Sequence, residues 1–223
     1  MSTTKVRLHT ELEIFLQSRK NFYQLLQLLF SDPLHGETLM QIKQNHTIQE
    51  LLEEIHEGGK ILHRYFEHLS EGQINQERDE YNRLFVGPGP LVAPAWESYY
   101  RSKEQLLFDN CNYEVRKQYH QFGLQNVREN NEPDDHLLLE LEFMIYLAEL
   151  SIKKIESIEL VDLLSSQISI LENHLSVWIP YFCKRIIENT HSQLYLGTAI
   201  LLEDFIGFDL QSLTEEKEAL INV

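Results

Sequence analysis

Apolar residues recur at helical spacing along almost the whole chain of 223 residues. Steps of three, four and seven separate them, and this period places them on one face of a helix. The first run begins at Leu8 and reaches Phe30, and Ser31-Asp32-Pro33 should end its helix. No segment shows the alternation that is typical of a half-buried strand. The spacing therefore predicts an all-α fold without strands.

A second run from Thr47 to Leu69 predicts one long helix with an apolar stripe that faces a core. Thr47 and Glu50 have the spacing of a capping box, in which two side chains satisfy the first backbone amides of a helix. Gly58-Gly59 lies inside this stripe, and each Gly costs roughly 1 kcal/mol relative to Ala in a helix. The pair indicates either close packing or a break.

Gly, Pro and polar residues divide the rest of the chain into further helices. A helix after Gly72 should end at Gly87-Pro88-Gly89-Pro90, because Pro has no backbone N–H and Gly releases the chain. The other helices are expected at about residues 97–108, 113–122, 135–148, 158–177, 180–189 and 192–205. Asp134 or Asp135 would cap the helix at 135–148.

The polar stretch from Gln125 to Pro133 is the strongest signal for a boundary within the chain. We therefore expect a bundle-like domain of two helical lobes joined by a hinge. The N-terminal lobe would cover residues 1–125, the hinge residues 126–134, and the C-terminal lobe residues 135–223.

The charge and composition exclude several classes of partner. With 19 Lys and Arg against 35 Asp and Glu, the formal charge is −16, so the chain repels a nucleic-acid backbone, and no basic patch compensates. The longest uncharged apolar window is too short to predict a membrane span. The charged start lacks the apolar region of a signal peptide, and the two cysteines are too few for a disulfide framework. These features predict a cytoplasmic protein.

Phosphate-binding loops, zinc helices and nucleophile elbows are absent from the sequence, so no cofactor is expected. Glu53 and His56 form one Glu-x-x-His pair, and Glu188 and His191 form another. In carboxylate di-iron bundles this spacing turns both side chains inward to share two metals. The alternative is a solvated face, because several glutamates crowd the same side of the helix that begins near Thr47.

The segment Glu132-Pro133-Asp134-Asp135-His136, with Glu140 four residues after His136, is rich in polar chemistry. One interpretation is structural: an Asp caps the next helix, and the His136–Glu140 pair adds a few tenths of a kcal/mol. The other is functional, because carboxylates at a hinge form an acidic pocket for a cationic partner. Both interpretations remain open at this point.

Aromatic and apolar residues gather on both sides of the Gly/Pro loop. They are Tyr81, Leu84, Phe85, Val92, Pro94, Trp96, Tyr99 and Tyr100, with Ser98 among them. Most could belong to a core. Aromatic patches beside loops also mark ligand or partner grooves, which is the functional alternative.

Together these segments resemble the TorD/DmsD family of redox-enzyme maturation chaperones. The resemblance rests on Glu80-Tyr81-x-x-Leu84-Phe85-x-Gly87-Pro88, then Pro94-x-Trp96-x-Ser98-x-Tyr100, then Glu132-Pro133-x-Asp135-His136-x-x-x-Glu140. His174-Leu175-x-x-Trp178-x-Pro180 is similar to the family's C-terminal lobe. Glu97 departs from the pattern, because a small residue is often found there.

The resemblance implies an all-α, non-enzymatic chaperone that acts in the cytoplasm on a molybdenum-cofactor oxidoreductase of the dimethyl sulfoxide reductase type. Such chaperones bind the twin-arginine leader of the precursor, or its folding body, until the cofactor is loaded. The alternative within the family is a chaperone of a leaderless, nitrate-reductase-type catalytic subunit. The resemblance also implies a monomer that can form a domain-swapped dimer, with the hinge as the natural point of exchange.

The implied leader-binding residues are Tyr81, Leu84, Phe85, Pro94, Trp96, Ser98, Tyr100, Glu132, Pro133, Asp135, His136 and Glu140. A leader with two guanidinium groups and an apolar segment needs a receptor with carboxylates and an apolar groove. Asp135 and Glu132, and with less support Glu97, are the expected arginine contacts. The aromatic residues would take the apolar part, whose burial should dominate affinity at about 25 cal/mol per Å². His136 would adjust the charge of the pocket near neutral pH.

Overall fold

The computed structural model describes residues 3–31, 36–55, 57–104, 108–129 and 132–222. Within these ranges the chain is helical and has no strand, which confirms the predicted fold class. No helix in the described part of the chain is both long and apolar enough to cross a membrane.

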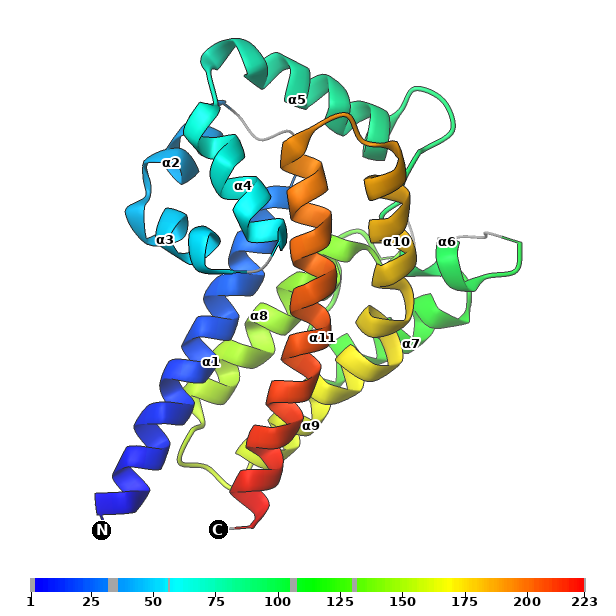
Figure 1. The fold of residues 1–223 in the computed structure, drawn as a ribbon. Coiled ribbons are helices and arrows are strands. Elements are labelled where there is room, and N and C mark those ends of the chain that lie inside the picture. The colour runs from blue at the N-terminus through cyan, green and yellow to red at the C-terminus, as the bar shows by residue number, and fades with distance from the viewer. Residues whose placement is uncertain (1–2, 32–35, 56, 105–107, 130–131, 223) are drawn as a thin grey trace. The chain divides into compact units, whose positions relative to one another are not determined.

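The helices follow one another along the chain as labelled in Figure 1. They are α1 (Thr3–Phe30), α2 (Gly36–Gln44), α3 (His46–Glu54), α4 (Glu57–His68), the 3-10 turn η1 (Glu71–Gln73), α5 (Ile74–Tyr81), the π-helical turn η2 (Asn82–Val86), α6 (Glu97–Arg101), α7 (Asn110–Gln121), α8 (Leu137–Lys153), α9 (Leu160–Ile170), the π-helical turn η3 (Leu171–Leu175), α10 (Ser176–Asn189) and α11 (Gln193–Ile221).

The chain forms two compact units, and each combines segments that are distant in the sequence. Unit 1 contains residues 1–27, 96–177 and 206–223, and unit 2 contains residues 28–95 and 178–205. The predicted hinge at 126–134 lies inside the range of unit 1, with unit 1 residues on both sides. Its behaviour as a hinge, and the lobes it would join, stay predictions.

Unit 1 is organised around packed helices and one buried ion pair. Helix α8 packs on α9, and α6 packs on α7. Arg19 of α1 donates to both carboxylate oxygens of Asp209 of α11, at 2.5 and 2.8 Å, and also donates to Gln167 of α9 at 2.7 Å. Tyr23 donates to the same carboxylate at 2.6 Å. These contacts join three helices through groups that are costly to bury unpaired.

Unit 2 contains α2, α3 and α4, which pack on one another, and the aromatic core described below. The predicted long helix from Thr47 is divided into α3 and α4, because Ile55 has an extended backbone with ψ 152°. Gly58 is also closely packed: a Cβ there would lie 2.6 Å from the backbone nitrogen of Leu201 and 2.8 Å from the carbonyl oxygen of Gly197. The glycines therefore mark close packing within α4, while the break in the predicted helix lies before them, at Ile55.

The capping residues differ from two sequence predictions. The cap of α3 is Asn45, whose side chain accepts from Ile48 N at 3.1 Å, and Thr47 lies inside the helix. The cap of α8 is His136, whose Nδ1 accepts from Leu138 N at 3.2 Å. The predicted caps, Thr47 for α3 and an Asp for α8, were wrong by one or two residues, since the local pattern does not distinguish neighbouring polar residues.

Other helix boundaries also differ from prediction: α2 was not predicted, and α11 continues to Ile221, beyond the end expected near residue 205. Helix α6 ends at Arg101, so the helix expected over 97–108 is a short one, and residues 105–107 lie outside the described part. Pro180 was predicted to open a helix but lies inside α10. Pro removes one backbone donor and crowds the preceding turn, and the wide π-helical turn η3 directly precedes α10.

Candidate functional site

The residues that the sequence predicts to bind a leader fall into two groups, one in each unit. Tyr81, Leu84, Phe85 and Pro94 belong to unit 2, and the others, from Trp96 to Glu140, belong to unit 1.

The unit 2 group forms part of a buried aromatic core. Phe85 contacts the rings of Phe30, Phe182 and Tyr195 at centroid distances of 6.1, 6.0 and 5.7 Å, and Tyr81 lies 5.1 Å from Phe85. Tyr81, Leu84, Phe85 and Pro94 are all buried. Gly87, with φ 103°, ends the helical turn that carries Leu84 and Phe85, in a conformation that favours glycine. In this conformation these side chains fill the interior of unit 2.

Glu80, which begins the same motif, fastens the connection between α10 and α11. Its carboxylate accepts from both Nε and Nη2 of Arg83, at 2.7 and 2.9 Å, from the Thr190 hydroxyl at 2.8 Å and from His191 N at 2.7 Å. Burial opposes ionisation, but these donors lower the pKa of Glu80 to about 2. Glu80 is therefore ionised near neutral pH and acts as a structural anchor for this connection.

Two motifs of unit 1 meet at an isolated antiparallel bridge between Trp96 and His136. Glu97 N donates to the Asp135 carbonyl at 3.0 Å, and the rings of Trp96 and His136 meet edge to face at 5.0 Å. Both rings are half-buried, so each keeps an accessible surface. The bridge thus brings together residues that are 40 positions apart in the sequence.

Asp135 lies beneath this bridge and has no exposed surface. Its Oδ2 accepts from Ser98 N at 2.6 Å, in the first turn of α6, and the Cys111 thiol lies 3.8 Å away. Burial raises the pKa of Asp135, while the hydrogen bonds from Ser98 oppose the rise. Asp135 therefore caps α6, a helix distant in sequence, and in this conformation it offers no carboxylate to a partner.

Glu97 is equally buried and belongs to a charge cluster. Its carboxylate pairs with Arg101, one turn further along, and lies 2.9 Å from Nδ1 of His174 in η3. Arg101 also donates to the carbonyl of Asn173 at 3.0 Å. The departure of Glu97 from the family pattern is thus accommodated by two basic partners.

Asp134 fastens the end of the predicted hinge to α7. Its carboxylate pairs with Arg116, its N–H donates to Asn112 Oδ1 at 2.6 Å, and its carbonyl accepts from the Tyr119 hydroxyl at 3.2 Å. Arg116 also lies 3.7 Å from Glu129. Arg101, Arg116, Asn112 and His174 were not predicted as site residues. The sequence offered two signals for them: the i, i+4 spacing of Glu97 and Arg101, and the place of His174 in the motif of the C-terminal lobe.

The remaining predicted residues differ in accessibility. Pro133 and Glu140 are buried, Ser98 is buried in α6, and Tyr100 is half-buried. Glu132 is 54% exposed and pairs with Arg128 at 2.5 Å. Burial lowers the pKa of His136 to about 4, so His136 is neutral near pH 7 in this conformation. The accessible part of the predicted site thus consists of Trp96, Tyr100, Glu132 and His136.

The metal-binding alternative receives no support from the described part of the chain, where no cluster of three or more His, Cys, Asp or Glu could hold an ion. Glu188 lies 3.8 Å from Lys184, and Glu80 accepts from the backbone N–H of His191. His56 lies outside the described residues.

Comparisons with known proteins place the chain in a family of chaperones. A family model described as the nitrate reductase delta subunit matches residues 48–184. The chain is 25% identical to the chaperone protein TorD of Aliivibrio fischeri over 213 residues, which cover 92% of this chain and 99% of that protein. It is 30% identical to DmsD of Haemophilus influenzae, named a probable Tat proofreading chaperone, over 135 residues that cover 60% of each chain.

A solved structure shares the fold. The crystal structure described as a redox enzyme maturation protein from Archaeoglobus fulgidus aligns with a TM-score of 0.51 and 23% identity. The alignment covers 85% of this chain and 93% of that one.

The helical fold and these relatives define a chaperone of redox enzyme maturation, which is not an enzyme. The chain belongs to the TorD/DmsD family, whose model is described as the nitrate reductase delta subunit. Membership in this family sets aside the di-iron enzyme as an alternative.

Proposed function

We propose that this chaperone binds the twin-arginine leader of a molybdenum-cofactor oxidoreductase precursor in the cytoplasm, before export. The observation that supports the proposal is the accessible edge of unit 1, where the half-buried Trp96 and His136 rings lie at the bridge. A relative named as a Tat proofreading chaperone points to the same class of ligand.

The accessible groups divide the binding energy unequally. Glu132 is the exposed carboxylate of the motif, and a leader arginine would have to compete with Arg128 for it. Exposed ion pairs contribute about 0.2–1 kcal/mol, so this exchange should mainly orient the peptide. The aromatic edges of Trp96 and His136 would contribute more, because burying apolar surface stabilises by about 25 cal/mol per Å². In this proposal the aromatic residues determine affinity and the acids determine orientation.

The proposed roles of the buried residues are different. Tyr81, Leu84, Phe85 and Pro94 would meet the leader only after the interior of unit 2 opened. Asp135, Ser98, Pro133 and Glu140 would shape the site from within, because they have almost no exposed surface. Direct contact by either set stays a prediction.

The proposal is tested by titrating a fluorescent twin-arginine leader peptide against the protein. Trp96→Ala should weaken binding about tenfold or more, and Glu132→Gln about two- to fivefold. Glu156→Gln is the matched control, since Glu156 is an exposed acid of unit 1 outside the motifs. Asp135 is a poor choice, because its substitution also removes the cap of α6. Equal affinity of Trp96→Ala and wild type would contradict the site assignment.

A second candidate function is favoured by the description of the family model, which names a nitrate reductase subunit. In that case the chaperone would bind the body of a leaderless catalytic subunit. Co-purification with a full-length precursor and with the same precursor lacking its leader separates the two. Capture of the precursor that lacks its leader at the same yield as the full-length precursor would favour the second function.

The oligomeric state is part of the same proposal. We infer a monomer that can exchange segments at residues 126–134. The contacts of Asp134 and Glu129 with α7 would have to open for exchange. Size-exclusion chromatography at several protein concentrations measures whether a dimer forms.

A further inference from the structure

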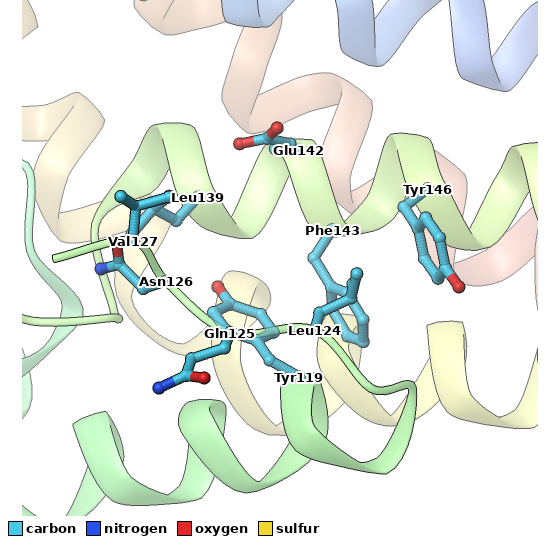
Figure 2. Close-up of a pocket in the computed structure, with 9 residues that line it drawn as sticks. All are labelled: Tyr119, Leu124, Gln125, Asn126, Val127, Leu139, Glu142, Phe143 and Tyr146. Atoms are coloured by element: carbon cyan, nitrogen blue, oxygen red, sulfur yellow. The ribbon is translucent and has the colours of Figure 1, made fainter. Parts of the chain in front are cut away.

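A hollow of about 250 Å³ lies in unit 1, apart from the Trp96–His136 bridge residues. Figure 2 shows Leu139, Phe143 and Tyr146 along α8, with the segment from Leu124 to Val127 crossing below the helix in this view. Tyr119 of α7 completes the floor. No sequence motif named above includes these residues as a binding site.

The lining has the composition of a side-chain receptor. Tyr119 and Phe143 form a buried aromatic floor, with ring centroids 4.8 Å apart. Leu124 and Leu139 are half-buried, and Val127 is 101% exposed. A fully exposed aliphatic residue beside an aromatic floor leaves apolar surface in contact with water, and such surface marks interaction sites.

The hollow is too small for a cofactor. Small-molecule and cofactor sites usually occupy about 300–1,000 Å³ and enclose most of the ligand. A volume of about 250 Å³ instead suits one large apolar side chain, or two small ones, from a peptide that remains partly outside. This size favours a peptide as the occupant.

The charge at the hollow specifies the neighbouring residue of such a peptide. Glu142 lines it from α8 and is exposed, and it is the charged residue among the lining residues. The whole chain carries a formal charge of −16. A Lys or Arg next to the apolar side chain is therefore complementary to the rim, whereas an acidic peptide is repelled.

The backbone beside the hollow can also receive a peptide. The segment from Leu124 to Asn126 is not helical, and Gln125 and Val127 are exposed. Their backbone N–H groups form no hydrogen bond with any residue in the described part of the chain. An extended peptide can use free amides of this kind, as it does when it pairs with a strand edge.

We propose that this hollow binds a large apolar side chain of the client peptide, and that a basic residue next to it pairs with Glu142. The inference rests on the proposed function, because it assigns a second contact to the same class of ligand. The bridge at Trp96 and this hollow would then hold different parts of one extended basic and apolar segment.

The test uses a fluorescein-labelled 12-residue peptide in which two arginines precede Phe and Leu. A second peptide replaces Phe and Leu with Ser, and a third replaces both arginines with Gln. We expect the second peptide to bind about tenfold or more weakly, because the apolar contact is lost. The third should bind about two- to fivefold more weakly.

Two pairs of variants place the peptide at the hollow. Val127→Ser should weaken binding about threefold, while Ile158→Ser should not, since Ile158 is a 95% exposed aliphatic residue of unit 1 outside the lining. Glu142→Gln should weaken binding about two- to fivefold, while Glu149→Gln, further along α8, should not. The two Glu variants change net charge equally, and Ile158→Ser removes more apolar surface than Val127→Ser, so a selective effect of Val127→Ser reflects its position.

A photo-crosslinking version of the first peptide, with benzoylphenylalanine at the Phe position, locates its side chain. Crosslinks to the residues that line the hollow, at 119, 124–127, 139, 142, 143 or 146, support the inference. Binding that is insensitive to both Val127→Ser and Glu142→Gln, with crosslinks elsewhere, overturns the hollow and leaves leader binding intact. Failure of the wild type to bind the first peptide overturns both. Self-association of the protein that Val127→Ser abolishes identifies a second copy as the occupant and overturns the inference.

Discussion

Adding one methyl group at Gly58 should destabilise the protein, whereas the same addition at Gly207 should stabilise it. A Cβ at Gly58 would lie 2.6 Å from Leu201 N, 2.8 Å from the Gly197 carbonyl oxygen and 3.0 Å from Leu201 Cα. All three are backbone atoms of one helix, so relief requires α4 and that part of α11 to separate. Gly207 is an exposed helical position where a Cβ would meet nothing within 4 Å.

The expected magnitudes follow from these contacts. Overpacking costs about 1–3 kcal/mol, and a clash with immovable backbone belongs at the upper end. The better helix propensity of Ala offsets at most about 1 kcal/mol, which leaves Gly58→Ala about 2 kcal/mol less stable. Gly207→Ala has no clash and gains about 0.5–1 kcal/mol. For a chain of this size, 1 kcal/mol shifts Tm by roughly 2–4 °C.

Thermal unfolding followed by circular dichroism at 222 nm measures both variants. We expect Tm to fall by about 4–8 °C for Gly58→Ala and to rise by about 1–4 °C for Gly207→Ala. Gly197→Ala should behave like Gly58→Ala, because its Cβ would lie 2.8 Å from Leu62 Cγ and 3.0 Å from the Gly58 carbonyl oxygen. A Gly58→Ala protein as stable as the wild type would refute the close approach of these two helix segments.

Three further predictions concern buried charge. The pKa of His136 is depressed to about 4, so the free energy of unfolding should decrease by roughly 2–3 kcal/mol as pH falls from about 6.5 to 4. The variant His136→Asn should retain the helix cap but lose this pH dependence. Its urea-unfolding midpoint should therefore change less between pH 7 and 4.5 than that of the wild type. The pKa of Glu80 is lowered to about 2, so its contribution to the free energy of unfolding, on the order of 1–2 kcal/mol after solvent screening, should disappear as pH falls from about 4.5 to 2. In Glu80→Gln this acid-dependent loss of stability should be absent. A variant whose stability falls with acid as that of the wild type does would contradict the assignment. Asp209→Ala should lower the free energy of unfolding by about 3–5 kcal/mol, because it leaves the Arg19 charge buried without its carboxylate. In denaturant titrations, the double variant with Arg19→Met should recover part of this loss. No recovery would argue against an unpaired charge as the cause.

The helical fold could be predicted from the sequence because its signals are local. Apolar period, Gly-Pro breaks and polar linkers depend on residues within one or two turns, and they predicted most of the helices, although α2 and the last part of α11 were missed. The errors arose where local signals compete. Thr47, Asn45 and their neighbours are all capable caps, and Pro180 is acceptable in a first turn or, at a cost, within a helix.

The candidate site could be predicted from the sequence only in part. The motifs predicted Trp96 and His136 as site residues, which stays a prediction, and the structure joins the two in one bridge. The sequence could not distinguish a carboxylate that faces a partner from one that caps another helix. Asp135 and Glu97 have their charges satisfied by Ser98 N and by Arg101, and such pairing depends on which helices pack together.

By itself the sequence determined that this protein is helical, acidic and related by its motifs to the TorD/DmsD chaperones. Periodicity and charge are properties of short windows, and motif order survives without coordinates. Only the tertiary structure decided which of those acidic and aromatic residues are accessible. Burial depends on contacts between segments that are far apart in the chain, and Trp96, His136 and Glu132 keep exposed surface while Asp135, Glu97 and Phe85 do not.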